Sequence, residues 1–193
     1  MIYTNKISRA IDFASRAHEN QKRKVLNYPY ISHPLSVLFL VSKFTDDEDV
    51  LVASILHDVV EDTNTNSSDI EIKFGKKVRD IIDVLTEDNI IENIKERKDK
   101  QLEKFKKAKN ETLLIKLADI IHNFCDILTV LEHYPKEIYL DVFGGNIKDK
   151  IKNAENRLNI IKNTWPENPL LPEAEMRFKD YKKTLERLNL IEL

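Results

Sequence analysis

The first candidate for chemistry is the segment that begins with His57 and Asp58 and directly follows the apolar run at residues 50–56. A histidine and an aspartate at the inner end of a buried helix cost several kcal/mol unless they are paired or bind a metal. Glu61 and Asp62 follow four residues later, so on a helix the four side chains lie on adjoining faces. The pattern indicates either a metal site with carboxylates for proton transfer or a hydrogen-bonded core pair.

A second group of polar side chains interrupts another apolar segment, residues 113–131. Asp119, His122 and Asn123 are three or four residues apart there, so they share one helical face. His33 stands directly before a proline that sets the start of a further helix. Two histidines and two aspartates from three helices can hold a divalent metal and leave positions open for water and substrate. The four candidate ligands are His33, His57, Asp58 and Asp119.

The alternative interpretation is structural. A buried His–Asp pair is more often a satisfied core pair than a ligand set, because proteins supply hydrogen-bond partners to buried polar groups. Packing alone gives no reason, however, to place four ionisable groups against one apolar helix. The second cluster, around Asp119 and Asn123, repeats the pattern. Together the two clusters favour a site with a chemical function.

The elements that must position these residues are predicted to be helices. Residues 35–134 contain no proline and a single glycine, Gly75, whereas strands need turns, which favour both residue types. Apolar residues recur at helical spacing in residues 7–14, 78–85 and 117–131. Residues 50–56 are apolar on all sides, as in a central helix. A buried parallel strand has the same pattern, but no alternating strand–helix repeat surrounds this segment, so an all-α fold is predicted.

Start and stop signals predict the bounds of two helices. Ser68 and Glu71 have the spacing of a capping box at the start of a short helix, and Gly75 is expected to end it. Residues 165–172 contain three of the six prolines and predict a rigid connector. An amphipathic helix is expected after it, at about residues 173–190.

The composition excludes several classes of protein. The 193 residues carry 31 Lys+Arg and 33 Asp+Glu, a net charge of −2, which removes the usual electrostatic reason for broad nucleic-acid binding. No apolar run approaches the ~18 residues that a membrane span needs, and the first residues lack the apolar core of a signal peptide. The single cysteine, Cys125, excludes an internal disulfide. We expect one cytoplasmic domain that forms no stable complex with nucleic acid or a membrane.

Five strings occur in a fixed order: Ala17-His18-x-x-Gln21-x-Arg23-Lys24, Pro29-Tyr30-Ile31-x-His33-Pro34, Leu56-His57-Asp58-Val59-Val60-Glu61-Asp62-Thr63, Phe74-Gly75-x-x-Val78 and Lys116-Leu117-Ala118-Asp119-x-x-His122-Asn123. This series resembles the hydrolase domain of the RelA/SpoT family and the stand-alone small alarmone hydrolases, metazoan SpoT homologues included. They belong to the HD-domain phosphohydrolases. The resemblance covers about residues 5 to 160. It implies an HD-domain helical bundle at residues 1–164, with residues 165–193 as a proline-rich connector and a C-terminal helix packed on the same domain.

The resemblance also implies an activity. Such enzymes use Mn²⁺ to remove the 3′-pyrophosphate from the small nucleotide (p)ppGpp, which gives GDP or GTP and pyrophosphate. By position in the strings, the ligands of the one metal ion are His33, His57, Asp58 and Asp119. Glu61 and Asp62 orient or deprotonate the attacking water and handle the proton of the leaving group. A bound divalent ion acidifies its water and offsets phosphate charge, so nearby carboxylates can complete the proton transfer.

The contacts that the resemblance implies for the substrate come from three segments. Arg23 borders or stacks on the guanine base and Lys24 meets phosphate, as suits a planar guanidinium and a compact ammonium. Asn123 lies near the sugar or the base. Residues 95–109 carry eight Lys/Arg and three acids, so they can neutralise a substrate with four or five phosphates, with Arg97 and Lys98 as candidate contacts. A solvated helix face explains that run of charge equally well.

Three functions are compatible with the sequence. The first is the (p)ppGpp pyrophosphohydrolase. The second is an HD phosphohydrolase of another nucleotide, such as a deoxynucleotide or the 2′-phosphate of NADPH, with the same metal. The third is a weakly catalytic domain that binds a nucleotide as a regulator, which the presence of every ligand and both acids disfavours. A homodimer through the last amphipathic helix is also compatible with the pattern.

Overall fold

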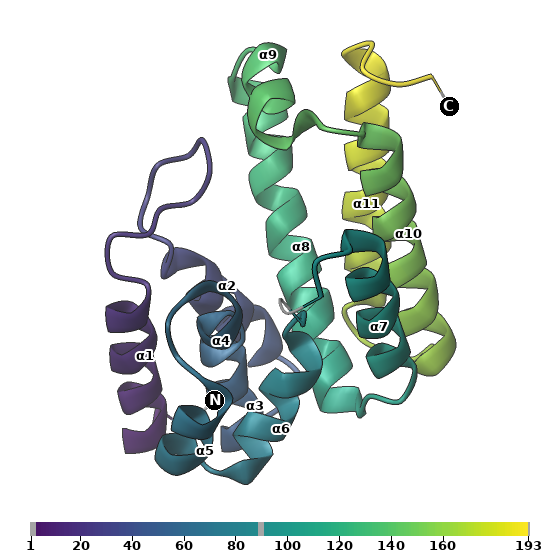
Figure 1. Ribbon diagram of the computed structural model, residues 1–193. Helices are drawn as coiled ribbons and strands as arrows, with labels where there is room; N and C mark the ends of the chain where they lie inside the picture. Colours follow the sequence, from purple (N-terminus) through teal and green to yellow (C-terminus); the bar gives the residue numbers. More distant parts are fainter. Residues whose placement is uncertain (1–2, 89–90, 193) are drawn as a thin grey trace.

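The computed structural model describes residues 3–88 and 91–192 and consists of α-helices with one π-helical turn, η1 (Figure 1). These residues contain no β-strand; Lys22 and Pro29 form an isolated β-bridge. The all-α prediction is confirmed. The elements are α1 (Asn5–Ala17), α2 (Ser32–Val41), α3 (Glu48–Leu56), α4 (Val59–Asp62), α5 (Ser67–Phe74), α6 (Lys76–Leu85), α7 (Ile94–Lys106), α8 (Asn110–His133), α9 (Lys136–Tyr139), η1 (Leu140–Gly144), α10 (Ile147–Thr164) and α11 (Leu171–Arg187).

Helix α8 is the central axis of the molecule (Figure 1). It packs against α2, α3 and α6 on one side and against α11 on the other, while α10 packs on α7 and α11. Its buried side chains include Leu117, Ile121 and Leu128, at the helical spacing seen in the sequence. Because α8 touches both groups of helices, it can present functional side chains to the space between them.

Helix α3 is the buried central helix. All residues from 50 to 56 are buried, and the side chain of Asp47 caps the helix by accepting from the N–H groups of Asp49 and Val50. The prediction of a helix rather than a parallel strand is confirmed. At His57 and Asp58 the chain leaves α3 and turns into the single turn α4. The His–Asp pair therefore lies at a junction between two helices.

The predicted cap of α5 is wrong. The cap is Asn66, whose side chain accepts from the N–H of Asp69 at 3.0 Å, while the Asp69 carboxylate accepts from the N–H of Asn66 at 3.3 Å. Asn66 has the extended backbone that an N-cap requires, whereas Ser68 already lies in the first helical turn. Gly75 ends the helix as predicted, with φ 97°, where a glycine avoids the strain of a side chain.

Helix α11 begins two residues earlier than predicted, at Leu171, because Pro172 fits the first turn of a helix, where its missing N–H is not needed. It ends at Arg187, shortly before Asn189, which has a φ of 56°. Its Phe178 ring lies 5.8 Å from the Phe124 ring of α8, centroid to centroid. Among the residues that the structure describes, no helix has both the length and the apolar character to span a membrane.

Candidate active site

The four predicted metal ligands converge where α2, the α3–α4 junction and α8 meet. His33 Nε2 lies 3.3 Å from His57 Nε2 and 3.4 Å from both Asp58 Oδ2 and Asp119 Oδ1. His57 Nε2 lies 3.2 Å from Asp58 Oδ1. Ligand atoms about 2.1 Å from one divalent ion are about 3 to 3.5 Å apart. The spacing of His33, His57 and Asp58 therefore fits a single ion, and Asp119 lies at the edge of this group, next to His33.

Hydrogen bonds behind the two imidazole rings turn their Nε2 atoms toward the centre. His57 Nδ1 donates to the carbonyl oxygen of Ser54 at 2.9 Å. His33 Nδ1 lies 2.9 Å from Nδ1 of His122, and burial together with the neighbouring His33 lowers the pKa of His122 to about 4. A neutral His122 can accept from His33, so each ligand ring has the tautomer that a metal needs once its Nε2 is free of a proton.

The charges of the cluster favour the binding of a cation. Burial acts to lower the pKa of His57, but the carboxylates of Asp58 and Asp119 outweigh it and raise that pKa to about 9. Burial acts to raise the pKa of Asp58, but His57 and His33 outweigh it and hold it well below its usual range. The carboxylates therefore hold a proton on His57 at neutral pH. A divalent ion can take the place of that proton, so the donor set suits a divalent metal.

Glu61 and Asp62 lie on α4, directly beyond the cluster. The Tyr30 hydroxyl is 2.7 Å from Asp58 Oδ2 and 2.8 Å from Asp62 Oδ2, so it links a candidate ligand to a candidate catalytic carboxylate. Glu61 Oε2 accepts from the backbone N–H of Glu87 at 2.9 Å. Burial nevertheless raises the pKa of Glu61 above its ordinary value. A carboxylate with a raised pKa is a better general base near neutral pH.

Tyr30 is a site residue that sequence reasoning did not assign. Its ring lies 4.6 Å from the His18 ring, centroid to centroid, and the Arg23 guanidinium lies 5.3 Å from its centroid. These neighbours fix the phenol and so aim its hydroxyl at the two carboxylates. The available signal was its place in the same string as His33, but nothing in that string shows which groups the hydroxyl meets.

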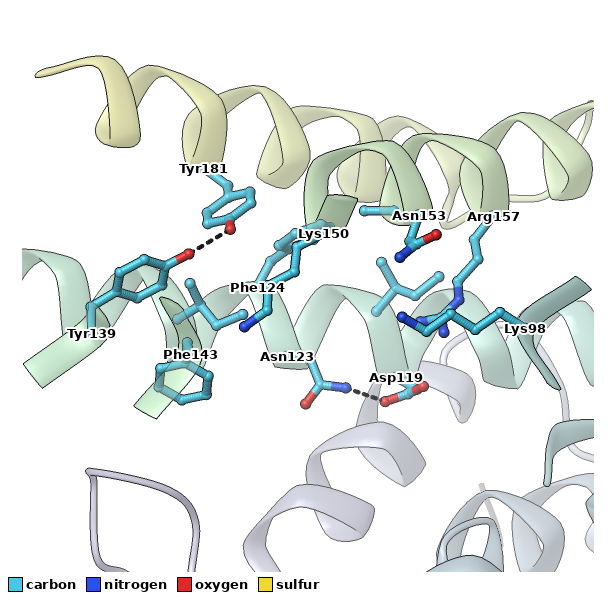
Figure 2. Close-up of a pocket in the computed structure, with 13 residues that line it drawn as sticks. Lys98, Asp119, Asn123, Phe124, Tyr139, Phe143, Lys150, Asn153, Arg157 and Tyr181 are labelled. Atoms are coloured by element: carbon cyan, nitrogen blue, oxygen red, sulfur yellow. Dashed lines mark hydrogen bonds between the residues drawn. The ribbon is translucent and has the colours of Figure 1, made fainter. Parts of the chain in front are cut away.

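A chain of hydrogen bonds joins the loop after α1 to the candidate ligands. Arg23 Nε donates to Asp126 Oδ2 at 2.7 Å, and its Nη2 donates to Asn123 Oδ1 at 2.7 Å. Asn123 Nδ2 in turn donates to Asp119 (Figure 2). Tyr28 donates to the other oxygen of Asp126 at 2.7 Å. Asp126 is not among the site residues predicted from the sequence, although its spacing from Asn123 places it on the same face of α8.

Two cavities open beside the cluster and share part of the α8 wall. The smaller one, about 230 Å³, lies against α7, α8 and α10, with Asp119 and Lys98 among its lining residues (Figure 2). The larger one, about 510 Å³, is lined by the loop after α1, including Arg23 and Lys24, and by Asp62. The residues that line both cavities are Asn123, Ile127 and Phe143.

The predicted cations of residues 95–109 are placed differently from one another. Lys98 lines the smaller cavity, whereas Arg97 lines neither of the two. Arg97 Nε lies 3.0 Å from Glu87 Oε2, and Arg157 Nη2 lies 3.2 Å from the other oxygen of that carboxylate. Arg97 is thus held by Glu87 beside the site.

Comparison with known proteins gives consistent matches. The family model described as HD domain matches residues 10–143. The guanosine-3′,5′-bis(diphosphate) 3′-pyrophosphohydrolase MESH1 of Xenopus tropicalis is 40% identical over 124 residues, which are 63% of this chain and 69% of that protein. MESH1 of Homo sapiens is 37% identical over 121 residues, 61% of this chain and 67% of that protein.

Solved structures show the same similarity in three dimensions. One, described as a metazoan ortholog of SpoT that hydrolyzes ppGpp, has a TM-score of 0.77 at 28% identity and covers 94% of this chain and 98% of its own. Another, from Listeria monocytogenes EGD-e, has a TM-score of 0.69 at 26% identity and covers 81% of this chain and 98% of its own. The similarity to the first structure extends over nearly the whole chain.

Proposed function

Because this chain belongs to the HD domain family, we propose that it is a metal-dependent guanosine-3′,5′-bis(diphosphate) 3′-pyrophosphohydrolase. It would convert (p)ppGpp to GDP or GTP and pyrophosphate. The observation that carries the proposal is the cluster of four metal donors next to two carboxylates, at the edge of cavities lined by cations. Relatives of 40% and 37% identity bear the name of this activity.

We propose Mn²⁺ as the ion. When bound, the ion supplies positive charge that stabilises phosphoryl oxygens and acidifies water. His57 must give up its proton for the ion to bind, and His122 keeps His33 in the required tautomer through the contact between their Nδ1 atoms. Lys116 Nζ donates to Asp119 Oδ2 at 2.8 Å and orients that carboxylate toward the cluster. The proposed ligands are His33, His57, Asp58 and Asp119.

The proton transfers fall to the carboxylates of α4. A water oxygen attacks the phosphorus attached to the 3′ oxygen, and the bond between that phosphorus and the 3′ oxygen breaks. Glu61, whose pKa burial raises, accepts the proton of the water. Asp62, held by Tyr30, handles the proton that the departing 3′ oxygen takes up. One proton leaves water and one reaches the 3′ hydroxyl, so the reaction balances.

The nucleoside is proposed to lie between the loop after α1 and α8. Arg23 and Lys24 line the larger cavity and Asn123 lines both, so all three can contact the base, sugar or phosphates. Lys98 is a phosphate contact from α7, and Arg97 stays a prediction because Glu87 holds its guanidinium. With one cysteine and therefore no internal disulfide, the chain suits the reducing cytoplasm, where we place this activity.

Metal removal tests the proposal directly. The metal-stripped protein is assayed with and without Mn²⁺ against ppGpp, NADPH and a panel of nucleoside mono- and triphosphates, with products separated by chromatography. We expect pyrophosphate and GDP from ppGpp in the presence of Mn²⁺ and loss of activity without it. Orthophosphate from NADPH with no turnover of ppGpp would contradict the proposed substrate, and full activity after stripping would contradict the metal.

A further inference from the structure

The face of α8 that points away from the candidate active site is the floor of two further cavities. One, of about 350 Å³, lies between α2, α8 and the start of α11, and the other, of about 410 Å³, lies between α8 and α11. Cys125 lines both, so together they form one groove; it is two residues after Asn123 and therefore about 200° around the helix axis from it. Among the residues that the structure describes, none lines both this groove and a cavity of the candidate active site.

Apolar side chains are exposed at the α2 end of the groove. Phe39 is 63% exposed, and Leu35 and Leu40 line the cavity beside it. On the opposite wall, Met176 is 48% exposed and lies one helical turn after Glu173, which also lines that cavity. Single exposed apolar residues are ordinary, but a cluster of them beside a groove is typical of a contact with another protein.

Charged side chains of both signs follow along α11. Glu173, Asp180, Lys183 and Arg187 are spaced by seven, three and four residues, so they lie on one helical face, with the acids before the cations. All four line the groove. In residues 3–88 and 91–192, Asp180, Lys183 and Arg187 have no ion-pair partner, and Glu173 reaches only Arg177, at 3.6 Å. The charges of this face are thus available to a partner.

This order of charges suits a second copy of the same chain better than a partner of one charge sign. A partner of one sign would attract either the acids or the cations and repel the others. In a contact with two-fold symmetry every pair of residues occurs twice. Two α11 helices that run antiparallel place the acidic part of each beside the basic part of the other, so the face is complementary to itself.

We propose that two copies of this chain associate through α2 and α11, with Phe39 in the contact and Asp180 of each copy paired with Lys183 of the other. From Glu173 to Arg187 the face extends about 21 Å along α11, and the axes of α2, α8 and α11 together span up to about 20 Å. Roughly 400 Å² per copy in projection is typical of a weak, reversible contact, so we expect a dissociation constant on the order of 10 µM.

Sedimentation velocity and light scattering, measured from about 1 to about 300 µM, test the association. We expect the wild type to pass from monomer to dimer over this range. Phe39→Ala should weaken the association about tenfold or more, because aromatic anchors supply much of the binding energy of such contacts. The side chain is largely exposed, so the substitution leaves the core intact.

Ile72 provides the matched control. It is 83% exposed on α5, which is not part of the proposed contact, so Ile72→Ala should leave the dissociation constant within about twofold of the wild type. A wild type that stays monomeric at the highest concentration would overturn the proposal. Equal losses in Phe39→Ala and Ile72→Ala would also overturn it, because they would show non-specific association.

Exchange of charges tests the proposed ion pair itself. Asp180→Lys places two cations at each pair, and Lys183→Glu places two acids there, so either variant alone should associate about tenfold more weakly or not at all. An equimolar mixture of the two variants again sets a cation opposite an acid at both pairs and should dimerise within about threefold of the wild type. A mixture that stays monomeric, or single variants that associate like the wild type, would overturn the pairing.

The dimer rests on no step of the proposed function, and the two proposals can fail separately. Hydrolysis of ppGpp by a protein that stays monomeric would support the function and overturn the dimer. A dimer that depends on Phe39 and Asp180, in a protein that does not hydrolyse ppGpp, would support the dimer and contradict the function.

Discussion

Neighbouring charges shift the pKa values of His57, Asp58 and Asp119 at the candidate metal centre. Asp58 and Asp119 raise the pKa of His57, and His33 lowers that of His122. His57, Asp58 and Asp119 all have an atom within 3.4 Å of His33 Nε2, so a change at one position alters the electrostatic surroundings of the others. Single substitutions here are expected to act on the whole cluster.

The raised pKa of His57 predicts how the metal-stripped protein responds to pH. The protonated ring stabilises the fold fully below the unfolded-state pKa of about 6.5, and this contribution is lost as pH rises through about 9. The melting temperature should therefore fall between these values. Mn²⁺ affinity should rise over the same range, because the proton and the ion compete for Nε2.

Calorimetry with Mn²⁺ and thermal melts, each measured from pH 6 to pH 10, check these two trends. The matched control is His133→Gln, which replaces an exposed histidine at the end of α8 and should keep both profiles. A Mn²⁺ affinity that is constant between pH 6 and pH 9 would contradict the protonation of His57.

Glu61→Gln separates catalysis from metal binding. The amide keeps the shape of the side chain but cannot accept the proton of water, so kcat for ppGpp should fall by roughly 10²- to 10⁴-fold. Mn²⁺ affinity, measured by calorimetry, should change less than threefold because Glu61 is not among the proposed ligands. Glu132→Gln, the same substitution at an exposed position on α8, should leave both values near those of the wild type. Unchanged kcat in Glu61→Gln would falsify its role as the base.

Local spacing explains which site residues could be predicted. His57, Asp58, Glu61 and Asp62 are neighbours in sequence, so helical periodicity alone placed them together. The contact of Tyr30 with Asp58 and Asp62 joins residues about thirty positions apart, and the hydrogen bonds of Arg23 to Asn123 and Asp126 join residues about a hundred positions apart. Such contacts depend on how elements dock, which residue spacing does not encode.

At the scale of elements, short helices and the ends of helices position the functional side chains. The chain breaks between α3 and α4 at His57 and Asp58, which frees their side chains from the apolar surroundings of α3. The loop after α1 is also specialised: Val25 has φ 68° and Asn27 has φ 59°, both in the left-handed region. A β-branched residue there is strained, and such strain persists only where the surroundings enforce it. The hydrogen bonds of Arg23 supply that enforcement.

The corrected cap of α5 can be tested with a pair of substitutions. Asn66→Ala removes the side chain that accepts from the Asp69 N–H and should lower the free energy of unfolding by about 1 kcal/mol. Ser68→Ala alters a residue inside the first turn and should cost less than about 0.5 kcal/mol. Urea unfolding measures both. A larger loss for Ser68→Ala than for Asn66→Ala would restore the cap predicted from the sequence.

Helix type was easier to predict than helix ends. The lack of proline and the long spacing of glycine gave an all-α fold, and complete burial of residues 50–56 agrees with their apolar pattern. The ends of α5 and α11 depended instead on competing capping groups: Asn66 outcompetes Ser68, and Pro172 fits inside a first turn. Several residues near each helix end could serve as the cap, and only the backbone geometry decides which of them does.

At the scale of the whole molecule, the proposed ion joins parts of the chain that are far apart in sequence. His33 comes from α2, His57 from the end of α3 and Asp119 from α8. A ligand that binds only the folded chain stabilises it by about 2.7 kcal/mol at a concentration a hundred times its Kd. The ion should therefore stabilise the folded protein in addition to its part in catalysis.

A melting experiment measures this stabilisation by the ion. For a chain of this size, saturating Mn²⁺ should raise the melting temperature by about 5 to 10 °C, and chelation should reverse the shift. Asp119→Asn retains a similar shape but loses a charged donor, so its shift should be much smaller. An equal shift in Asp119→Asn would place the ion elsewhere.

Helix α8 sets one further constraint, on where the chain can change in length. One face of α8 carries Asp119, Asn123 and Asp126. Successive side chains of an α-helix are rotated by about 100° around the helix axis. One residue inserted between Asp119 and Asn123 would place the two side chains on different faces of the helix. The chain of hydrogen bonds from Asp119 through Asn123 to Arg23 would then break. Seven inserted residues would restore the phase but separate the groups by an extra 10 Å or so. Insertions and deletions should therefore accumulate in connectors such as residues 165–170, while the length of α8 between these side chains stays fixed.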